Sequence, residues 1–219
     1  MKLTNEEQWI DLSHVVADAM PVWDGDPLVK LQPIANLDAN GYCDSVLHTG
    51  MHAGTHVDGP LHMTSQGNHI ARMPLHRFAG EGVLLNMQNN VAQLIDEVTG
   101  MSLIGKIVLL HYDHDQYWGK PPYYTDYPEL DLALAHLLVK KQVKMIGMDT
   151  PSPDRSPYPL HQLFLEHGIL LIENLTGLSH LISVDAFEVL AFPLKIDADS
   201  SPARVVARVI ASGINAFGH

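Results

Sequence analysis

Four side chains with metal-binding chemistry lie within eleven consecutive positions of the chain. They are separated by four, two and four residues: His52, His56, Asp58 and His62. On a helix, His52 and His56 would share a face, but Asp58 would lie about 200° around the axis from His56. In an extended chain all four positions have the same parity, so the side chains can project to one side. The sequence therefore predicts an extended segment that presents three imidazoles and one carboxylate together.

These residue types suit a metal centre. Two imidazoles and a carboxylate are a common ligand set for zinc, manganese or iron. Gly54 and Gly59 carry no side chains, and we expect them to allow a close approach between the backbone and a bound ion. The alternative is that Asp58 and His62 pair locally as packed side chains and do no chemistry.

The same segment resembles a family signature. Residues 52–62 read His-Ala-Gly-Thr-His-Val-Asp-Gly-Pro-Leu-His, which is similar to the pattern His-x-Gly-Thr-His-x-Asp-x-Pro-x-His of the cyclase family of metal-dependent hydrolases. That family includes bacterial kynurenine formamidase and isatin hydrolase. Further segments resemble other family blocks along nearly the whole chain: 11–14 with 20–27, 147–154, 172–175 and 192–195. The resemblance implies a metal-dependent enzyme.

The resemblance also implies a role for each position of the signature. His52, His56 and Asp58 match the residues that bind a first ion, and Asp58 would also reach a second ion. His62 matches the general acid/base of the family. The implied cofactor is a pair of divalent ions, with zinc expected and manganese as the alternative.

A downstream histidine and glutamate complete the implied site. The family places them twelve positions apart, and His161 and Glu173 stand at that spacing, with His161 on the second ion and Glu173 touching both. Six helical residues after His161 rise about 9 Å, and four strand steps to Glu173 return about 13 Å. With Gly168 reversing the chain between them, the two side chains can meet. A carboxylate beside the apolar run 169–172 is costly to bury unless it is paired or metal-bound.

The implied chemistry is hydrolysis of an amide, a formamide or a lactam. A divalent ion lowers the pKa of a bound water to about 7, and His62 can take a proton from that water and return it to the leaving nitrogen. Trp23 matches a tryptophan that contacts the aromatic substrate in kynurenine formamidase, although it could instead be a buried core residue. The block 149–154 resembles the broader hydrolase family more than it resembles kynurenine formamidase itself. N-formylkynurenine, isatin and other aryl amides therefore all remain candidate substrates.

Two other classes of function remain open. One is metal-dependent cyclisation or dehydration, which releases water, whereas hydrolysis incorporates one solvent oxygen. The other is a non-enzymatic metal-binding or sensor protein, which needs no open coordination position. Outside the signature, we expect His48 at most to contact the ligand residues without binding an ion itself. His111, Asp113 and His114 follow an apolar run, and we expect them to line the mouth of the pocket and not to bind an ion.

Short apolar runs indicate the elements that must position these residues. Strands are expected at the apolar runs 82–87, 106–111, 145–148 and 168–174 and at the alternating segment 203–211, and helices at 91–98, 132–138 and 159–167. Apolar runs without alternation suit strands that are covered on both faces. Strands interleaved with short helices predict an α/β class with a mixed or parallel sheet, in a single domain over residues 1–219. The family resemblance adds a swivelling β/β/α arrangement, which periodicity does not define.

The composition of the chain limits the classes of partner that the protein is expected to bind. The net charge of −12 argues against nucleic acid and anionic membranes, since both need a basic surface. Cys43 is the only cysteine, so an internal disulfide is excluded. Residues 1–11 do not fit a secretory signal, and no stretch reaches the roughly 18–20 apolar residues of a membrane span. We expect a cytoplasmic protein that acts on a small molecule, and the resemblance implies a homodimer or homotetramer.

Overall fold

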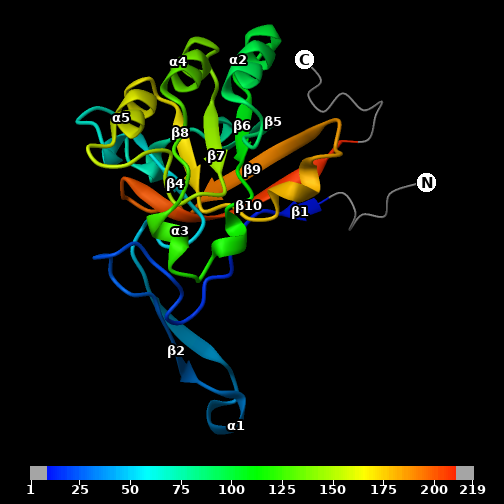
Figure 1. The fold of residues 1–219 in the computed structure, drawn as a ribbon. Helices are drawn as coiled ribbons and strands as arrows, with labels where there is room; N and C mark the ends of the chain where they lie inside the picture. The colour runs from blue at the N-terminus through cyan, green and yellow to red at the C-terminus, as the bar shows by residue number, and fades with distance from the viewer. Residues whose placement is uncertain (1–8, 211–219) are drawn as a thin grey trace.

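The computed structural model describes residues 9–210 of the chain, and its main feature is a closed sheet. Strands follow the order β1-β10-β4-β8-β7-β6-β5-β9, and β9 also pairs with β10, so that the sheet closes into a barrel (Figure 1). The strands of the barrel sheet are β1 (Trp9–Asp11), β4 (His56–Asp58), β5 (Ala79–Asn86), β6 (Ile107–His111), β7 (Met145–Met148), β8 (Leu170–Glu173), β9 (Phe187–Pro193) and β10 (Ser200–Val209).

The sheet is mixed, as the sequence predicts. Strands β5 to β8 run parallel, whereas β4, β9 and β10 join the sheet through antiparallel pairings. Three helices lie together along one side of the barrel (Figure 1): α2 (Val91–Gly100), α4 (Leu132–Lys140) and α5 (Pro159–Glu166). Two single-turn helices complete the set: α1 (Leu37–Asn40) and α3 (Pro122–Thr125). The expected α/β class is confirmed.

Two apolar cores explain why the parallel strands do not alternate with polar residues. In β6, Ile107 and Leu109 belong to the cluster that fills the barrel, whereas Val108 and Leu110 belong to the cluster between the barrel and the helices. All four side chains are fully buried. Both faces of the strand are therefore covered, which is the environment that an uninterrupted apolar run predicts.

The predicted elements are present with shifted ends. Strand β7 has the predicted bounds, and α2 begins at Val91 as predicted, because the Asn90 side chain accepts a hydrogen bond from its first turn. Strand β5 begins three residues earlier than predicted, since Ala79 already pairs with β9. Strand β10 begins at Ser200, and the predicted end of that strand, residue 211, lies outside the described residues.

A projecting hairpin is absent from the sequence prediction. Strands β2 (Lys30–Ala35) and β3 (Asp44–His48) form a separate two-stranded sheet that extends away from the barrel (Figure 1). Pro33 within β2 argues against a strand in the sequence, because proline cannot donate to a ladder. Strand β9 was also missed, since Glu188 interrupts its apolar run. No helix among residues 9–210 has the length and apolar character needed to cross a membrane.

A glycine pair tests how tightly the barrel is packed. A Cβ at Gly82 in β5 would overlap the ring of Phe187, whereas a Cβ at Gly100, the last residue of α2, would meet nothing within 4 Å. Gly82→Ala is expected to lower the free energy of unfolding by about 1–3 kcal/mol because it overpacks the core. Gly100→Ala, the control, is expected to leave it unchanged or raise it by about 0.4–1 kcal/mol. Urea denaturation measures both, and equal effects would contradict the packing described here.

Candidate metal centre

The pairing of β4 with β8 places two side chains of the candidate centre next to each other. His56 lies directly opposite Glu173 in the antiparallel register. The neighbouring residues Val57 and Ile172 point into the barrel, so His56, Asp58 and Glu173 point to the outer face of the sheet, beside α5. His56 Nε2 lies 3.3 Å from Asp58 Oδ1 and 3.4 Å from Glu173 Oε2.

His161 reaches the same face from α5. Its Nε2 lies 3.1 Å from Glu173 Oε1 and 3.9 Å from Asp58 Oδ2, so the predicted meeting of His161 and Glu173 is observed. The Asp154 carboxylate accepts hydrogen bonds from the amides of Leu160 and His161, at 2.6 and 3.3 Å, and so caps α5. It also lies 2.6 Å from His161 Nδ1. Asp154 therefore fixes both the helix start and the ring, which turns Nε2 towards the site.

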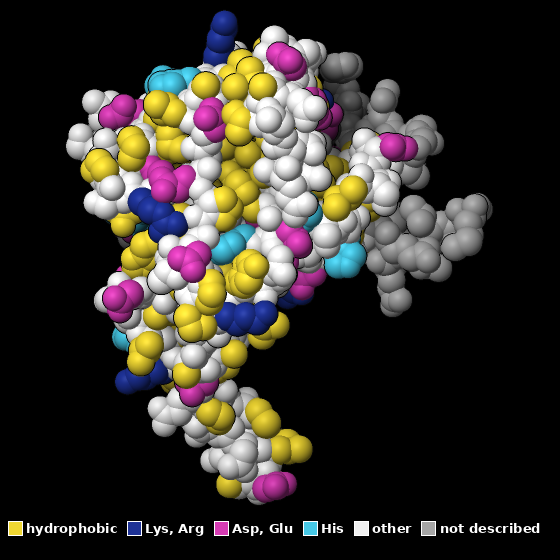
Figure 2. Space-filling model, viewed as in Figure 1, with side chains coloured by type: hydrophobic (Ala, Val, Ile, Leu, Met, Phe, Trp, Pro, Cys, Tyr) yellow, Lys and Arg dark blue, Asp and Glu magenta, His cyan; other side chains and the backbone are white. Residues whose placement is uncertain are grey.

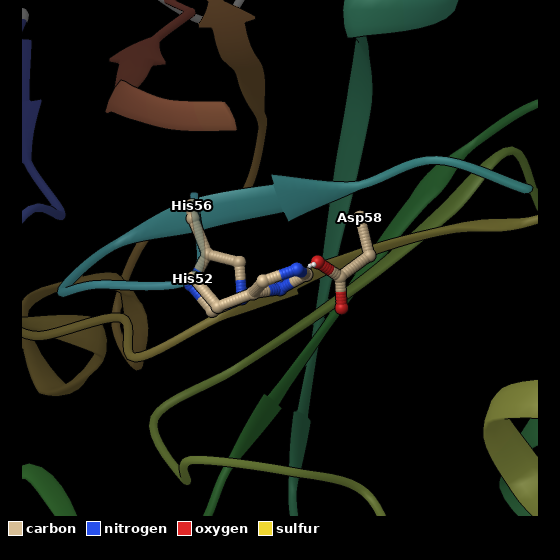
Figure 3. Close-up of side chains that lie close together, drawn as sticks. All are labelled: His52, His56 and Asp58. Atoms are coloured by element: carbon tan, nitrogen blue, oxygen red, sulfur yellow. Dashed lines mark ion pairs between the residues drawn. The ribbon is translucent and has the colours of Figure 1, made fainter. Parts of the chain in front are cut away.

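His52 and His62 lie outside the strand, which corrects the prediction of one extended segment. Only residues 56–58 are strand; His52 lies in the turn before them and His62 in a short 3-10 helix after them. The chain turns at Gly54, whose φ is +65°. The side chains still converge, since His52 Nδ1 lies 2.9 Å from Asp58 Oδ1 (Figure 3) and the His52 and His62 rings are 4.2 Å apart.

The two glycines of the segment make room for neighbouring protein atoms. A Cβ at Gly54 would lie 2.7 Å from Met20 Cε. A Cβ at Gly59 would lie 2.5 Å from the carbonyl oxygen of Asp199. Glycine is needed at position 59 because a backbone oxygen lies too close for a side chain, and it is favoured at position 54 because φ is +65° there.

Polar atoms at the centre are buried, and imidazoles lie beside carboxylates within ion-pair distance. Four of these atoms make no hydrogen bond of good geometry: His56 Nε2, both Asp58 carboxylate oxygens and Glu173 Oε1. Leaving a buried polar group unpaired costs about 1–3 kcal/mol, and more for a charged group. A divalent cation bound by these atoms would offset that cost, because imidazole and carboxylate are its ordinary ligands. The residues present therefore fit a metal ion.

Several donor sets in the described part of the chain are compact enough to hold an ion. In each set the ligand atoms lie within 4.8 Å of one another: His52, His56 and Asp58; Asp58, His62 and His161; and His52, His62 and Asp199. Asp58 belongs to two of these sets, and its two oxygens face different imidazoles. Its carboxylate can therefore bridge two ions.

In the absence of an ion, the carboxylates keep the neighbouring imidazoles of His56 and His161 protonated. Burial lowers the pKa of His161, but hydrogen bonds with Asp154 and Glu173 outweigh burial and raise that pKa to about 10. Burial is likewise outweighed at His56, where Asp58 and Glu173 raise the pKa well above its ordinary value. Burial raises the pKa of Asp58, but the His56 and His52 imidazoles together outweigh burial and hold that pKa well below its usual range. A metal ion needs neutral imidazoles and must displace these protons.

His62 differs from His56 and His161 in its protonation state. Burial lowers the pKa of His62 below its ordinary value of 6.5, against a smaller opposing effect of Asp58. The imidazole is therefore mainly neutral at pH 7 and can accept a proton. Its Nδ1 lies within hydrogen-bond distance of the Asp199 carboxylate, at 3.3 Å.

A cavity of about 190 Å³ opens beside these side chains. Its walls contain five residues of the centre and an aromatic group: His52, His56, His62, His161 and Glu173, with Trp23, Tyr124 and Tyr158. Trp23 is partly exposed and meets Tyr124 edge to face, with 5.7 Å between ring centroids, so it is not a core tryptophan. The volume is below the roughly 300–1,000 Å³ of pockets for drug-sized ligands, which favours a small substrate.

The residues after β6 do not line this cavity, contrary to the prediction. Backbone amides of residues 112–114 donate hydrogen bonds to the Asp149 carboxylate, which folds the segment that contains Asp113 and His114 around that side chain. Burial raises the pKa of Asp149 to about 7. His111 is buried at the end of β6. These side chains support the sheet edge and lie outside the cavity wall.

Sequence reasoning missed Asp154 and Asp199, the carboxylates beside the outer ring nitrogens. A metal-bound histidine usually donates its second N–H to a carboxylate or a carbonyl. This rule predicts that such acceptors exist, but it does not say which residues they are. Which aspartate supplies that acceptor depends on tertiary contacts. His48, which was given a supporting place, is exposed at the end of β3 and does not line the cavity.

Known proteins share this sequence pattern and fold. A family model described as putative cyclase matches residues 10–155. The chain is 30% identical over 212 residues to kynurenine formamidase of Bacillus mycoides, which covers 93% of this chain and 98% of that protein. An isatin hydrolase bound to the product analogue thioisatinate superposes with a TM-score of 0.83 at 19% identity, over 93% of both chains. A structure described as a predicted metal-dependent hydrolase from Bacillus stearothermophilus superposes with a TM-score of 0.72 at 25% identity, over 91% of this chain and 97% of the other.

The raised imidazole pKa values predict proton release on metal binding. Because the pKa of His161 is about 10 and that of His56 is also raised, both rings carry protons at pH 7 in the metal-free protein. Binding of zinc or manganese is expected to release about one proton or more per ion, and affinity is expected to rise as the pH increases. Calorimetric titrations in buffers of different ionisation enthalpy measure the released protons. A binding enthalpy that is independent of the buffer would contradict the prediction.

Proposed function

The chain belongs to the putative cyclase family, and from that premise we propose that it is a metal-dependent hydrolase that cleaves an amide C–N bond other than a peptide bond. One observation carries the proposal. Buried imidazole and carboxylate atoms of His56, Asp58 and Glu173 meet behind a cavity whose wall includes His56 and Glu173, together with His62 and Trp23. Buried ligands beside a cavity provide a metal centre with room for a reactant, which a purely structural metal site does not need.

Five residues are proposed as ligands of two divalent ions. His52, His56 and Asp58 would hold the first ion, and His161 and Glu173 would hold the second, with Asp58 and Glu173 reaching both. Zinc is the expected metal and manganese the alternative, since both accept imidazole and carboxylate ligands. Bound ions lower the pKa of a water and polarise a substrate carbonyl.

His62 is proposed as the general acid/base. Its ring centroid lies 4.2 Å from that of His52 and 5.9 Å from that of His161, so it borders both proposed ion positions. The lowered pKa keeps the imidazole mainly neutral at pH 7, ready to accept a proton from the attacking water. The same imidazole then returns the proton to the leaving nitrogen.

The cavity walls support an aromatic amide as substrate. Trp23 and Tyr124 provide aromatic surfaces opposite the proposed ligands, and such surfaces can hold an anilide ring. The relative that is 30% identical is a kynurenine formamidase, which favours an arylformamide such as N-formylkynurenine. An isatin-like lactam is the second candidate, because a cavity of about 190 Å³ suits a compact bicyclic molecule.

The proposal includes a homodimer or homotetramer in the cytoplasm. The hairpin β2–β3 carries exposed apolar side chains away from the barrel (Figure 2): Leu31, Ile34, Val46 and Leu47. Exposed apolar surface of this kind is typical of contacts between protein chains. A cytoplasmic location is supported by Cys43, which is an exposed free thiol.

Metal removal and reloading test the proposal. The purified protein would be stripped of metal, loaded with zinc or manganese separately, and assayed with N-formylkynurenine and with isatin. We expect either ion to restore cleavage, with the formamide preferred. His62→Ala is expected to lower kcat by about 10²–10⁴-fold while the bound metal is retained. His69→Ala is the matched control, because His69 pairs with Asp197 at the surface and does not line the cavity.

Three outcomes would contradict parts of the proposed function. Absence of stoichiometric metal together with absence of turnover would contradict the hydrolase proposal. A slight loss of activity in His62→Ala would exclude its role in proton transfer. Release of water, without incorporation of a solvent oxygen into the product, would replace hydrolysis by cyclisation or dehydration.

A further inference from the structure

The residue before β10 brings a third carboxylate to the edge of the metal centre. One oxygen of Asp199, Oδ2, lies 3.3 Å from His52 Nε2 and 3.3 Å from His62 Nδ1. The other ring nitrogen of His52, Nδ1, faces Asp58 at 2.9 Å. A single carboxylate oxygen therefore lies between one proposed metal ligand and the proposed acid/base.

The surrounding backbone fixes the place of this carboxylate. The amide of Gly59 donates a hydrogen bond to the Asp199 carbonyl at 3.0 Å, and the amide of Ile70 donates to the Ala198 carbonyl at 2.9 Å. Because a Cβ at position 59 would lie 2.5 Å from the Asp199 carbonyl oxygen, glycine is needed for this approach. The buried hydroxyl of Ser200 donates to Asp199 Oδ2 at 3.2 Å. The carboxylate is thus held in place from several directions.

The other two imidazoles proposed as ligands have an acceptor on the ring nitrogen that faces away from the centre. His56 Nδ1 donates to the carbonyl oxygen of Gly54 at 2.8 Å. His161 Nδ1 lies 2.6 Å from the Asp154 carboxylate. Such acceptors fix the tautomer and the orientation of a metal-bound imidazole. In the third imidazole, His52, the corresponding nitrogen faces Asp199.

We propose that Asp199 is a positioning residue that fixes the orientations of the His52 and His62 rings relative to each other. Its carboxylate accepts a hydrogen bond from His62 Nδ1–H, which leaves Nε2 of His62 as the basic nitrogen for proton transfer. The same oxygen faces Nε2 of His52 and keeps Nδ1 of that ring turned towards Asp58. This inference rests on the proposed function, since it gives the acid/base its orientation.

Asp197 provides a matched control two residues away. It contacts His69 Nδ1 at 2.7 Å and Arg72 at 3.5 Å, on the exposed surface of the same loop. Removal of its carboxylate changes the charge of the protein as much as removal of Asp199 does. It contacts none of the residues that line the cavity in the described part of the chain.

Metal affinity and steady-state kinetics of Asp199→Ala, Asp199→Asn and Asp197→Ala test the inference. Asp199→Ala is expected to lower both kcat and zinc affinity by about 10–100-fold, with KM changed much less. Asp199→Asn retains an oxygen acceptor and is expected to recover part of both losses, and Asp197→Ala is expected to match the wild type. Zinc affinity is measured by competition with a chelator, and thermal unfolding of the zinc-free proteins reports whether each variant folds.

A second readout separates this inference from the proposed function. Nitrogen-15 NMR of the histidine rings in the zinc-loaded protein is expected to show the Nδ1–H tautomer of His62, and its loss in Asp199→Ala. Wild-type zinc affinity, kcat and tautomer in a folded Asp199→Ala variant would overturn the inference. If the wild type binds zinc but turns over neither substrate, both proposed substrates are wrong, while zinc affinity and the tautomer still decide the role of Asp199.

Discussion

A fully buried carboxylate surrounded by imidazoles constrains this structure more than any other single group. Asp58 has an exposed fraction of 0%, and its oxygens face His52, His56 and His161. Glu173 places a second, nearly buried carboxylate beside the same imidazoles. Two buried negative charges at one point are costly unless positive charge is bound there. Protonated imidazoles or metal ions can supply this positive charge, and the arrangement of the segments around Asp58 suits either of them.

The fold creates this position by covering the outside of a barrel. Because Val57 and Ile172 fill the barrel interior, the residues on either side of them face outward and are covered by α5. The proposed ligands come from three kinds of local structure: a turn before β4, the strands β4 and β8, and the helix α5. The resulting site is buried against the sheet and adjoins a cavity whose wall includes Trp23, which is an environment in which a metal ion and a small aromatic molecule can meet.

Local patterns predicted much of the architecture, and tertiary contacts account for the rest. The apolar runs identified four strands of the barrel because both faces of those strands are buried. The same reasoning missed β2, where Pro33 and exposed side chains remove the pattern. At the site, the family signature and the spacing of His161 from Glu173 identified residues that do converge. The signature could not reveal Asp154 or Asp199, because their relation to the imidazoles exists only after α5 and β10 have packed.

The most direct measurement is anomalous diffraction from crystals of the protein loaded with manganese or zinc, recorded on both sides of the metal absorption edge. We expect strong anomalous peaks among His56, Asp58, His161 and Glu173, within bonding distance of the buried imidazole nitrogen and carboxylate oxygens there. Two peaks that share the Asp58 carboxylate would support the binuclear centre. A fully loaded protein with no peak at this position would contradict the central claim that these buried side chains form a metal site.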